Sequence, residues 1–162
     1  MNLINNKSTI FIIFILGILF HFLISLLFSQ PFIFGDEVSY KTMAYSFYKY
    51  GDLYHIQSTQ MGHTTEIPNF LYQLLISPSF YFGDFFLVII KLINSITVSL
   101  IIFPLYFILK DFIDNDLYIF FSLVLILLIP DLNYSVSVMP ESLFLLLFIL
   151  TFYFSYKYFI NN

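Results

Sequence analysis

The 162-residue chain contains no cysteine and no tryptophan, and all six of its basic residues are lysines. The lack of cysteine excludes disulfides, thiolate metal sites and a cysteine nucleophile. Only 10% of the residues are charged, against about 25% in a typical soluble domain. Six lysines and ten acidic residues give a net charge of −4, so the chain has no basic surface of the kind that binds nucleic acid.

Apolar residues dominate what is present. Hydrophobic residues make up 60% of the chain and aromatic residues 22%, and the mean hydropathy is +0.91. So few charged side chains cannot cover the apolar atoms of a water-soluble fold of this size. The composition therefore predicts an all-α protein that crosses a lipid bilayer several times, with tyrosine alone in the interfacial aromatic role that tryptophan usually shares.

Four apolar runs are candidate transmembrane helices, because a helix needs about 20 apolar residues to cross the hydrocarbon core. These runs are 8–29, 86–109, 117–134 and 139–159. The first is too long for a signal-peptide core and lacks a cleavage motif, so we expect it to remain as a span. The third is the least regular, since Pro130 interrupts it. We interpret residues 1–162 as a single polytopic membrane domain.

The loop between the first two spans, residues 30–85, carries most of the polar side chains. Apolar residues between Asp36 and Tyr50 recur at three- and four-residue spacings and Gly51 follows them, which predicts an amphipathic interfacial helix with Asp36 as its N-cap. Residues 70–82 are apolar but too short to cross, which predicts an interfacial or re-entrant helix.

Lysine positions give the predicted orientation. Lys7, Lys110 and Lys157 fall on one side of the predicted spans, and Lys41 and Lys49 fall on the other. The side with more lysines is expected to be cytoplasmic. The sequence therefore predicts a multi-pass protein of the plasma (inner) membrane with residues 30–85 on the non-cytoplasmic side.

The adjacent acids Asp36 and Glu37 follow the first span and are candidates for catalysis. Neighbouring carboxylates raise one another's pKa, so that one of them can serve as a general base. The same two side chains are also suited to the first turn of a helix, where they stabilise its dipole. Glu141 has a comparable choice between capping the last span and facing a cavity, and capping is the simpler interpretation.

Several motifs together resemble one enzyme family. They are GDEVSY at 35–40, GDLY at 51–54, PNFLYQLL at 68–75, KLIN at 91–94 and MPESLF at 139–144. In order and spacing these motifs resemble the GT-C glycosyltransferases, and most of all the protein O-mannosyltransferases and the lipid A aminoarabinose transferase. The chain departs from the family's Lys-Pro-Pro, because it has glutamate at position 66 before Ile67 and Pro68.

The resemblance implies transfer of a sugar from a polyprenyl-phosphate donor to an acceptor hydroxyl at the outer membrane face, with inversion at the sugar. Asp36 would be the general base, and Glu37 would position the acceptor or share its proton. Tyr40, Lys41 and Lys91 would bind substrate, with the lysines stabilising the lipid phosphate that leaves. Family members are several hundred residues long, which implies a missing C-terminal region or a larger membrane partner for this chain.

A metal site and two other functions stay open as alternatives. His63 and Glu66, with His55, have the residue types to hold a divalent metal, although loop histidines are more often solvated. A non-catalytic accessory or truncated protein that keeps the N-terminal GT-C fold would carry the same motifs. A small transporter needs polar residues facing each other within the spans. His21, Asn94 and Lys91 are the nearest to that pattern.

Overall fold

The computed structural model describes residues 7–27, 35–56, 70–129, 136–138 and 140–161, and these residues contain helices but no strand. The helices are α1 (Lys7–Leu27), α2 (Gly35–Tyr50), α4 (Phe70–Ile76), the 3-10 helix η1 (Ser77–Phe85), α5 (Phe86–Ser99), α6 (Ile102–Phe112), α7 (Asp116–Leu127) and α8 (Glu141–Asn161). The predicted all-α class is therefore confirmed over the described residues.

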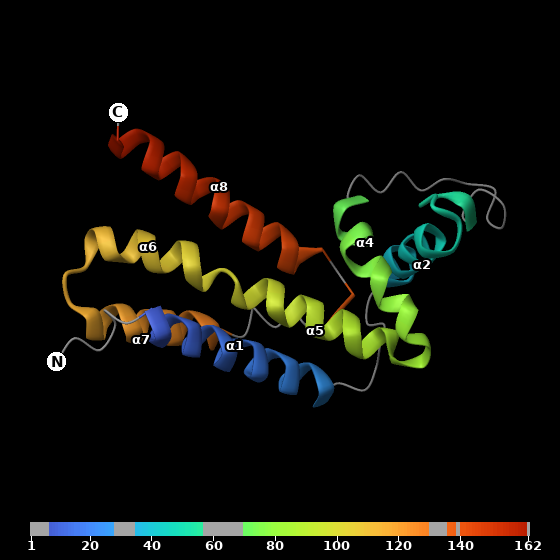
Figure 1. The fold of residues 1–162 in the computed structure, drawn as a ribbon, viewed down its shortest axis with the longest axis horizontal. Coiled ribbons are helices and arrows are strands. Elements are labelled where there is room, and N and C mark those ends of the chain that lie inside the picture. The colour runs from blue at the N-terminus through green and yellow to red at the C-terminus, as the bar shows by residue number, and fades with distance from the viewer. Residues whose placement is uncertain (1–6, 28–34, 57–69, 130–135, 139, 162) are drawn as a thin grey trace.

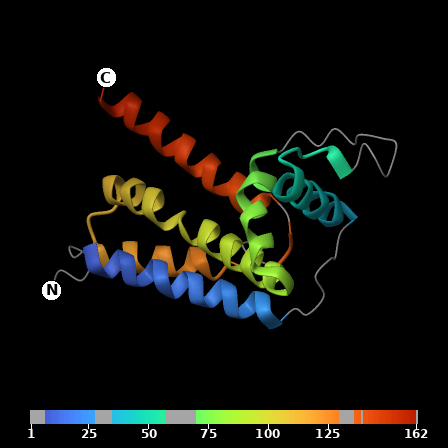
Figure 2. The same ribbon diagram turned by 45° about the vertical axis from the view of Figure 1, so that its right-hand side comes forward.

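The helices form an elongated bundle with a smaller helical cluster at one end (Figure 1). The α1 helix packs along α5, α6 and α7, and α8 runs at an angle across α5 and α6. The α2 and α4 helices and η1 contact one another where α1 ends and α5 begins (Figures 1 and 2). The α1 helix begins and α8 ends at the opposite end of the bundle. The polar loop therefore folds against one end of the bundle.

Three helical stretches are long and apolar enough to cross a membrane, namely Ser8–Leu27, Phe70–Phe112 and Glu141–Ile160. They support the prediction of a membrane protein. The count of four spans is not confirmed, because α7 has 12 residues and its helix ends at Leu127. Twelve helical residues extend only about 18 Å, against a hydrocarbon core about 30 Å thick.

The second predicted span, 86–109, consists of two helices that meet in a turn at Leu100 and Ile101. Pro104 causes this break, because proline has no N–H and its ring collides with the carbonyl four residues earlier. The carbonyl of Leu100 instead accepts a hydrogen bond from the N–H of Phe103 at 3.2 Å. The span ends three residues later than predicted, at Phe112, and a kink at Gly83 with non-helical φ and ψ separates it from the preceding helices α4 and η1.

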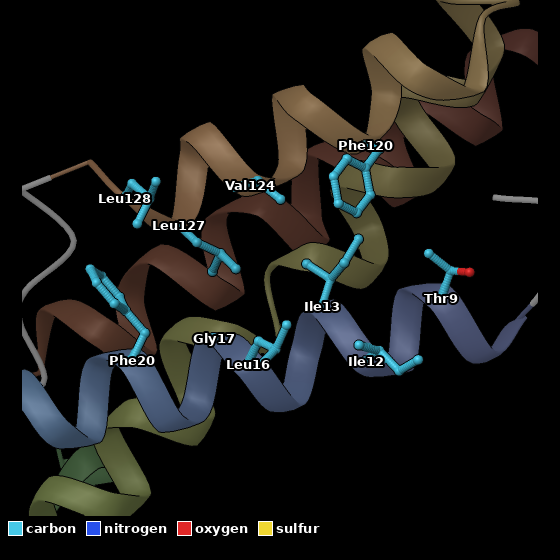
Figure 3. A pocket seen from close by; sticks show the side chains of 10 residues that line it. All are labelled: Thr9, Ile12, Ile13, Leu16, Gly17, Phe20, Phe120, Val124, Leu127 and Leu128. Atoms are coloured by element: carbon cyan, nitrogen blue, oxygen red, sulfur yellow. The ribbon is translucent and has the colours of Figure 1, made fainter. Parts of the chain in front are cut away.

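An apolar groove of about 400 Å³ lies between α1 and α7. Figure 3 shows Ile13 and Leu16 of α1, with Phe120 and Leu127 of α7, around this groove. The two helices come closest at Gly17, the middle residue of the 21-residue α1. A Cβ atom at this glycine would lie 3.0 Å from Cδ1 of Leu127. The C-terminal end of α7 is therefore level with the middle of α1.

Gly17→Val is expected to destabilise the bundle by about 1 kcal/mol, because the methyl groups of valine enter space that Leu127 and Ser99 already fill. The Oγ atom of Ser99 lies 3.1 Å from the position of a Cβ at residue 17. This cost exceeds the gain in helix propensity when valine replaces glycine, which is about 0.4 kcal/mol. Titration with SDS in mixed micelles measures the unfolding free energy. Leu23→Val, at an exposed position of the same helix, is the control. Equal stability of the two variants would contradict close packing at Gly17.

Candidate functional site

The site begins at the first turn of α2, which carries Asp36 and Glu37. The helix starts at Gly35, so the predicted N-cap role of Asp36 is wrong and this residue lies within the first turn. A carboxylate there still faces the positive end of the helix dipole. The Asp36 side chain is exposed, whereas that of Glu37 is fully buried. The two neighbouring acids therefore have different environments.

The other end of α2 follows the prediction. Gly51 directly follows the helix with φ of 71°, a conformation that favours glycine. Its N–H donates to the carbonyl of Phe47 at 2.8 Å, which satisfies one of the last carbonyls of the helix. The hydroxyl of Ser46 then donates to the carbonyl of Asp52 at 2.6 Å. These contacts fix the C-terminal end of α2 and the turn after it.

The inner face of α2 packs on α4 through two tyrosines. The rings of Tyr40 and Tyr72 are 6.0 Å apart and meet edge to face at 89°. Both belong to a buried cluster with Ala44, Ile76 and Val138. The predicted substrate-binding residue Tyr40 therefore points inward, towards the bundle, and only 9% of it is exposed.

Beneath α2 lies a group of four hydrogen-bonded residues, Tyr72, Asn94, Ser137 and Ser142, which we call the polar centre. The side-chain amide of Asn94 donates to the carbonyl of Ser137 at 2.8 Å and to the hydroxyl of Tyr72 at 3.2 Å. Its Oδ1 accepts from the hydroxyl of Ser142 at 3.3 Å. One asparagine thus joins α4, α5, α8 and the segment 136–138.

The polar centre lies within the length of the bundle. Ser137 and Ser142 both form hydrogen bonds with Asn94, which lies eight residues after Phe86 in α5. The described residues between α7 and α8 are not helical. Non-helical backbone at membrane depth occurs where protein buries it or where it lines a water-filled cavity. Residues 136–138 are buried. The described segment 136–138 is therefore buried within the bundle, and Asn94 satisfies the carbonyl of Ser137.

Three carboxylates lie near the two tyrosines. Burial raises the pKa of the Tyr40 hydroxyl, and the negative charges of Glu141 and Asp36 raise it further. Glu141 and Glu37 also interact electrostatically with Tyr72. The Tyr40 phenol is protonated at neutral pH, as an ordinary tyrosine is, and can donate a hydrogen bond. The arrangement combines an exposed carboxylate on Asp36, a buried one on Glu37 and a phenol donor.

Glu141 belongs to this region although the sequence favoured a capping role. It lies in the first turn of α8. Its Oε2 atom is buried and accepts no hydrogen bond from any residue that the structure describes. The neighbouring Ser142 anchors this turn to Asn94. Glu141 therefore adds a negative charge next to the polar centre.

The two lysines predicted to bind substrate lie in different places. Lys91 is buried, and its Nζ donates to the carbonyl of Ser25 at 2.6 Å in the last turn of α1. A cation at this position stabilises the negative end of the helix dipole. Lys41 is half-buried on α2, with its Nζ 5.0 Å from the centre of the Phe86 ring. The structure therefore gives Lys91 a helix-capping contact, and its role with substrate stays a prediction.

The predicted metal ligands His63 and Glu66 lie outside the described residues. Among the residues that are described, no group of three histidine, cysteine, aspartate or glutamate side chains could hold a metal ion. His55 packs its ring against Tyr50, with centroids 4.2 Å apart. The three carboxylates near Tyr40 are thus not grouped as a metal site, and the divalent-metal hypothesis stays confined to the loop.

Comparisons with protein-family models, with curated proteins and with solved structures find no match for this chain. The functional interpretation therefore depends on the residues and their geometry. The sequence singled out Asp36, Glu37 and Tyr40, and these lie on one helix over the polar centre. It did not assign Tyr72 or Ser142 to a site, although both lie in motifs that carry the resemblance, because a single tyrosine or serine in an apolar run does not indicate one.

Proposed function

We propose that the chain takes part in transferring a sugar from a polyprenyl-phosphate donor to an acceptor hydroxyl at the outer face of the plasma membrane. In this proposal residues 30–85 lie on the non-cytoplasmic side. The observation that carries it is the first turn of α2, where Asp36 is exposed and Glu37 is buried. Two neighbouring carboxylates in unlike environments can take unlike roles in proton transfer. The resemblance to GT-C glycosyltransferases covers the same two residues.

The proposed step is an inverting displacement. The acceptor oxygen attacks the anomeric carbon and forms the new glycosidic bond, while the bond from that carbon to the donor phosphate breaks. Asp36 takes the proton of the acceptor hydroxyl, and the polyprenyl phosphate leaves with the bonding electron pair. The resemblance assigns Glu37 to positioning the acceptor and Tyr40 to binding substrate, although both side chains are buried in the structure. Cations are needed to stabilise the charge of the leaving phosphate.

A non-catalytic accessory role is the second candidate, and one contact favours it. The Nζ of Lys91 is bound to the carbonyl of Ser25, which removes one of the two cations proposed to stabilise the leaving phosphate. An accessory protein would supply the α2 surface to a larger membrane partner. Such a protein would copurify with that partner and would transfer no sugar alone.

Transfer can be tested with the protein in vesicles and a panel of radiolabelled sugars on undecaprenyl phosphate. Release of undecaprenyl phosphate, coupled to labelling of an acceptor in an outer-membrane extract, is expected for at least one sugar. Inactivity of the isolated chain that is relieved by a copurifying partner would favour the accessory role. Inactivity with and without such a partner would contradict sugar transfer.

The proposed orientation can be tested separately, because the chain has no cysteine of its own. Asp52→Cys places a single thiol in the exposed turn after α2. A maleimide that cannot cross membranes is expected to label it in intact cells. Labelling that requires opened membranes would place α2 in the cytoplasm and would exclude transfer at the outer face.

A further inference from the structure

A second cavity, of about 480 Å³, lies between α2 and η1 and is separate from the groove between α1 and α7. Lys41 and Tyr45 line it from α2, Phe80 and Gly83 line it from η1, and Phe86 lines it from the start of α5. Gly83 has a φ of 56°, and no heavy atom lies within 4 Å of the position of a Cβ there. The glycine thus leaves one side of the cavity open.

The described walls of this cavity are mostly aromatic and include one lysine, Lys41. The ring of Phe80 lies 5.3 Å from that of Tyr45 and stacks on that of Phe86 at 5.0 Å. Among the described residues that line the cavity, Lys41 is charged and none is acidic. Its Nζ lies 5.0 Å from the Phe86 ring. A cation held in apolar walls suits an anion attached to an apolar body.

The cavity lies where a helical span begins. Phe86 is both a wall of the cavity and the first residue of α5. Beside it, η1 exposes Tyr81 (76%), Phe82 (56%) and Phe85 (68%). Aromatic side chains gather at the level of lipid headgroups, where the polar and hydrocarbon layers meet. A ligand with a charged group and an apolar chain can therefore lie across this boundary.

We propose that this cavity binds the headgroup of an anionic phospholipid from the surrounding leaflet, with its phosphate at Lys41 and an acyl chain passing Phe86 along α5. Charge complementarity with Lys41 selects an anionic headgroup, and the aromatic walls accommodate the glycerol backbone. A prenyl phosphate has the same chemistry of a phosphate ester on an apolar chain, so the test distinguishes the two sources. This proposal does not depend on sugar transfer.

Lipid retention by the purified protein tests the proposal. Native mass spectrometry of the full chain, titrated with phosphatidylglycerol or with phosphatidylcholine of the same chain length, is expected to show preferential retention of one phosphatidylglycerol. Lys41→Gln should lower that retention about fivefold, the effect of one lysine near an anionic lipid. It should leave phosphatidylcholine binding unchanged. Lys41→Arg should retain the preference.

Lys49→Gln is the matched control, because Lys49 lies on the same helix, is exposed and does not line the cavity. An equal loss in this variant would overturn the proposal, since the effect would then be one of general surface charge. Equal retention of the two lipids by the unmodified protein would overturn it without any variant. Displacement of phosphatidylglycerol by an equimolar amount of farnesyl phosphate would overturn the choice of a phospholipid.

Discussion

Asp36→Asn is expected to abolish sugar transfer by the active protein, or by the complex that contains it, while membrane insertion and folding stay intact. Asparagine has nearly the same shape as aspartate, and loss of the charge in the first turn costs α2 only about 0.3–1 kcal/mol, so the helix stays folded. An amide cannot accept the proton of an attacking hydroxyl at neutral pH. Loss of a general base lowers kcat by roughly 100- to 10,000-fold. Initial rates with a radiolabelled donor measure the effect.

Asp52→Asn is the control for this experiment. Asp52 is an exposed aspartate just beyond α2, and its Oδ1 accepts the N–H of Tyr54 at 3.0 Å. An asparagine oxygen can accept the same hydrogen bond, so transfer should be unchanged. If Asp36→Asn also retained full activity, Asp36 would only stabilise the dipole of α2. The base would then have to be sought elsewhere.

The structure agrees best with the predictions from the sequence where a local pattern determines the fold. Apolar runs predicted α1 and α8 because a helix that crosses lipid needs a certain number of apolar residues, and that number can be counted. Gly51 predicted the end of α2, because its role depends on its own backbone conformation. The start of the same helix was misplaced, since no residue before Asp36 marks it as clearly.

The predictions from the sequence fail where the structure depends on packing between distant parts of the chain. The length of α7 could not be predicted from hydropathy, because the apolar run continues beyond Leu127 while the helix does not. The polar centre was equally hidden, since Tyr72 and Ser142 are 22 and 48 residues away from Asn94. A hydrogen bond across such separations depends on how α4, α5 and α8 pack.

Asn94→Leu is expected to lower the free energy of unfolding by about 3 kcal/mol, because leucine keeps the bulk but makes none of the hydrogen bonds to Tyr72, Ser137 and Ser142. The carbonyl of Ser137 and the hydroxyls of Tyr72 and Ser142 would lose their partner in a buried place. Titration with SDS in mixed micelles measures the loss. In a protein that transfers sugar, the rate should fall too, since the first turn of α8 loses its attachment beneath Tyr40.

Two further variants separate this network from a general effect of losing a buried polar group. Ser95→Ala removes a buried hydroxyl that bonds only within its own helix, to the carbonyl of Lys91 at 2.8 Å, so it should cost much less. Tyr72→Phe should lower the stability of the unmodified protein more than it lowers the stability of the Asn94→Leu variant. In that variant the hydrogen-bond partner of Tyr72 is already absent. Additive losses from Tyr72→Phe and Asn94→Leu would mean that the two side chains act independently. In that case the four residues would not form one network.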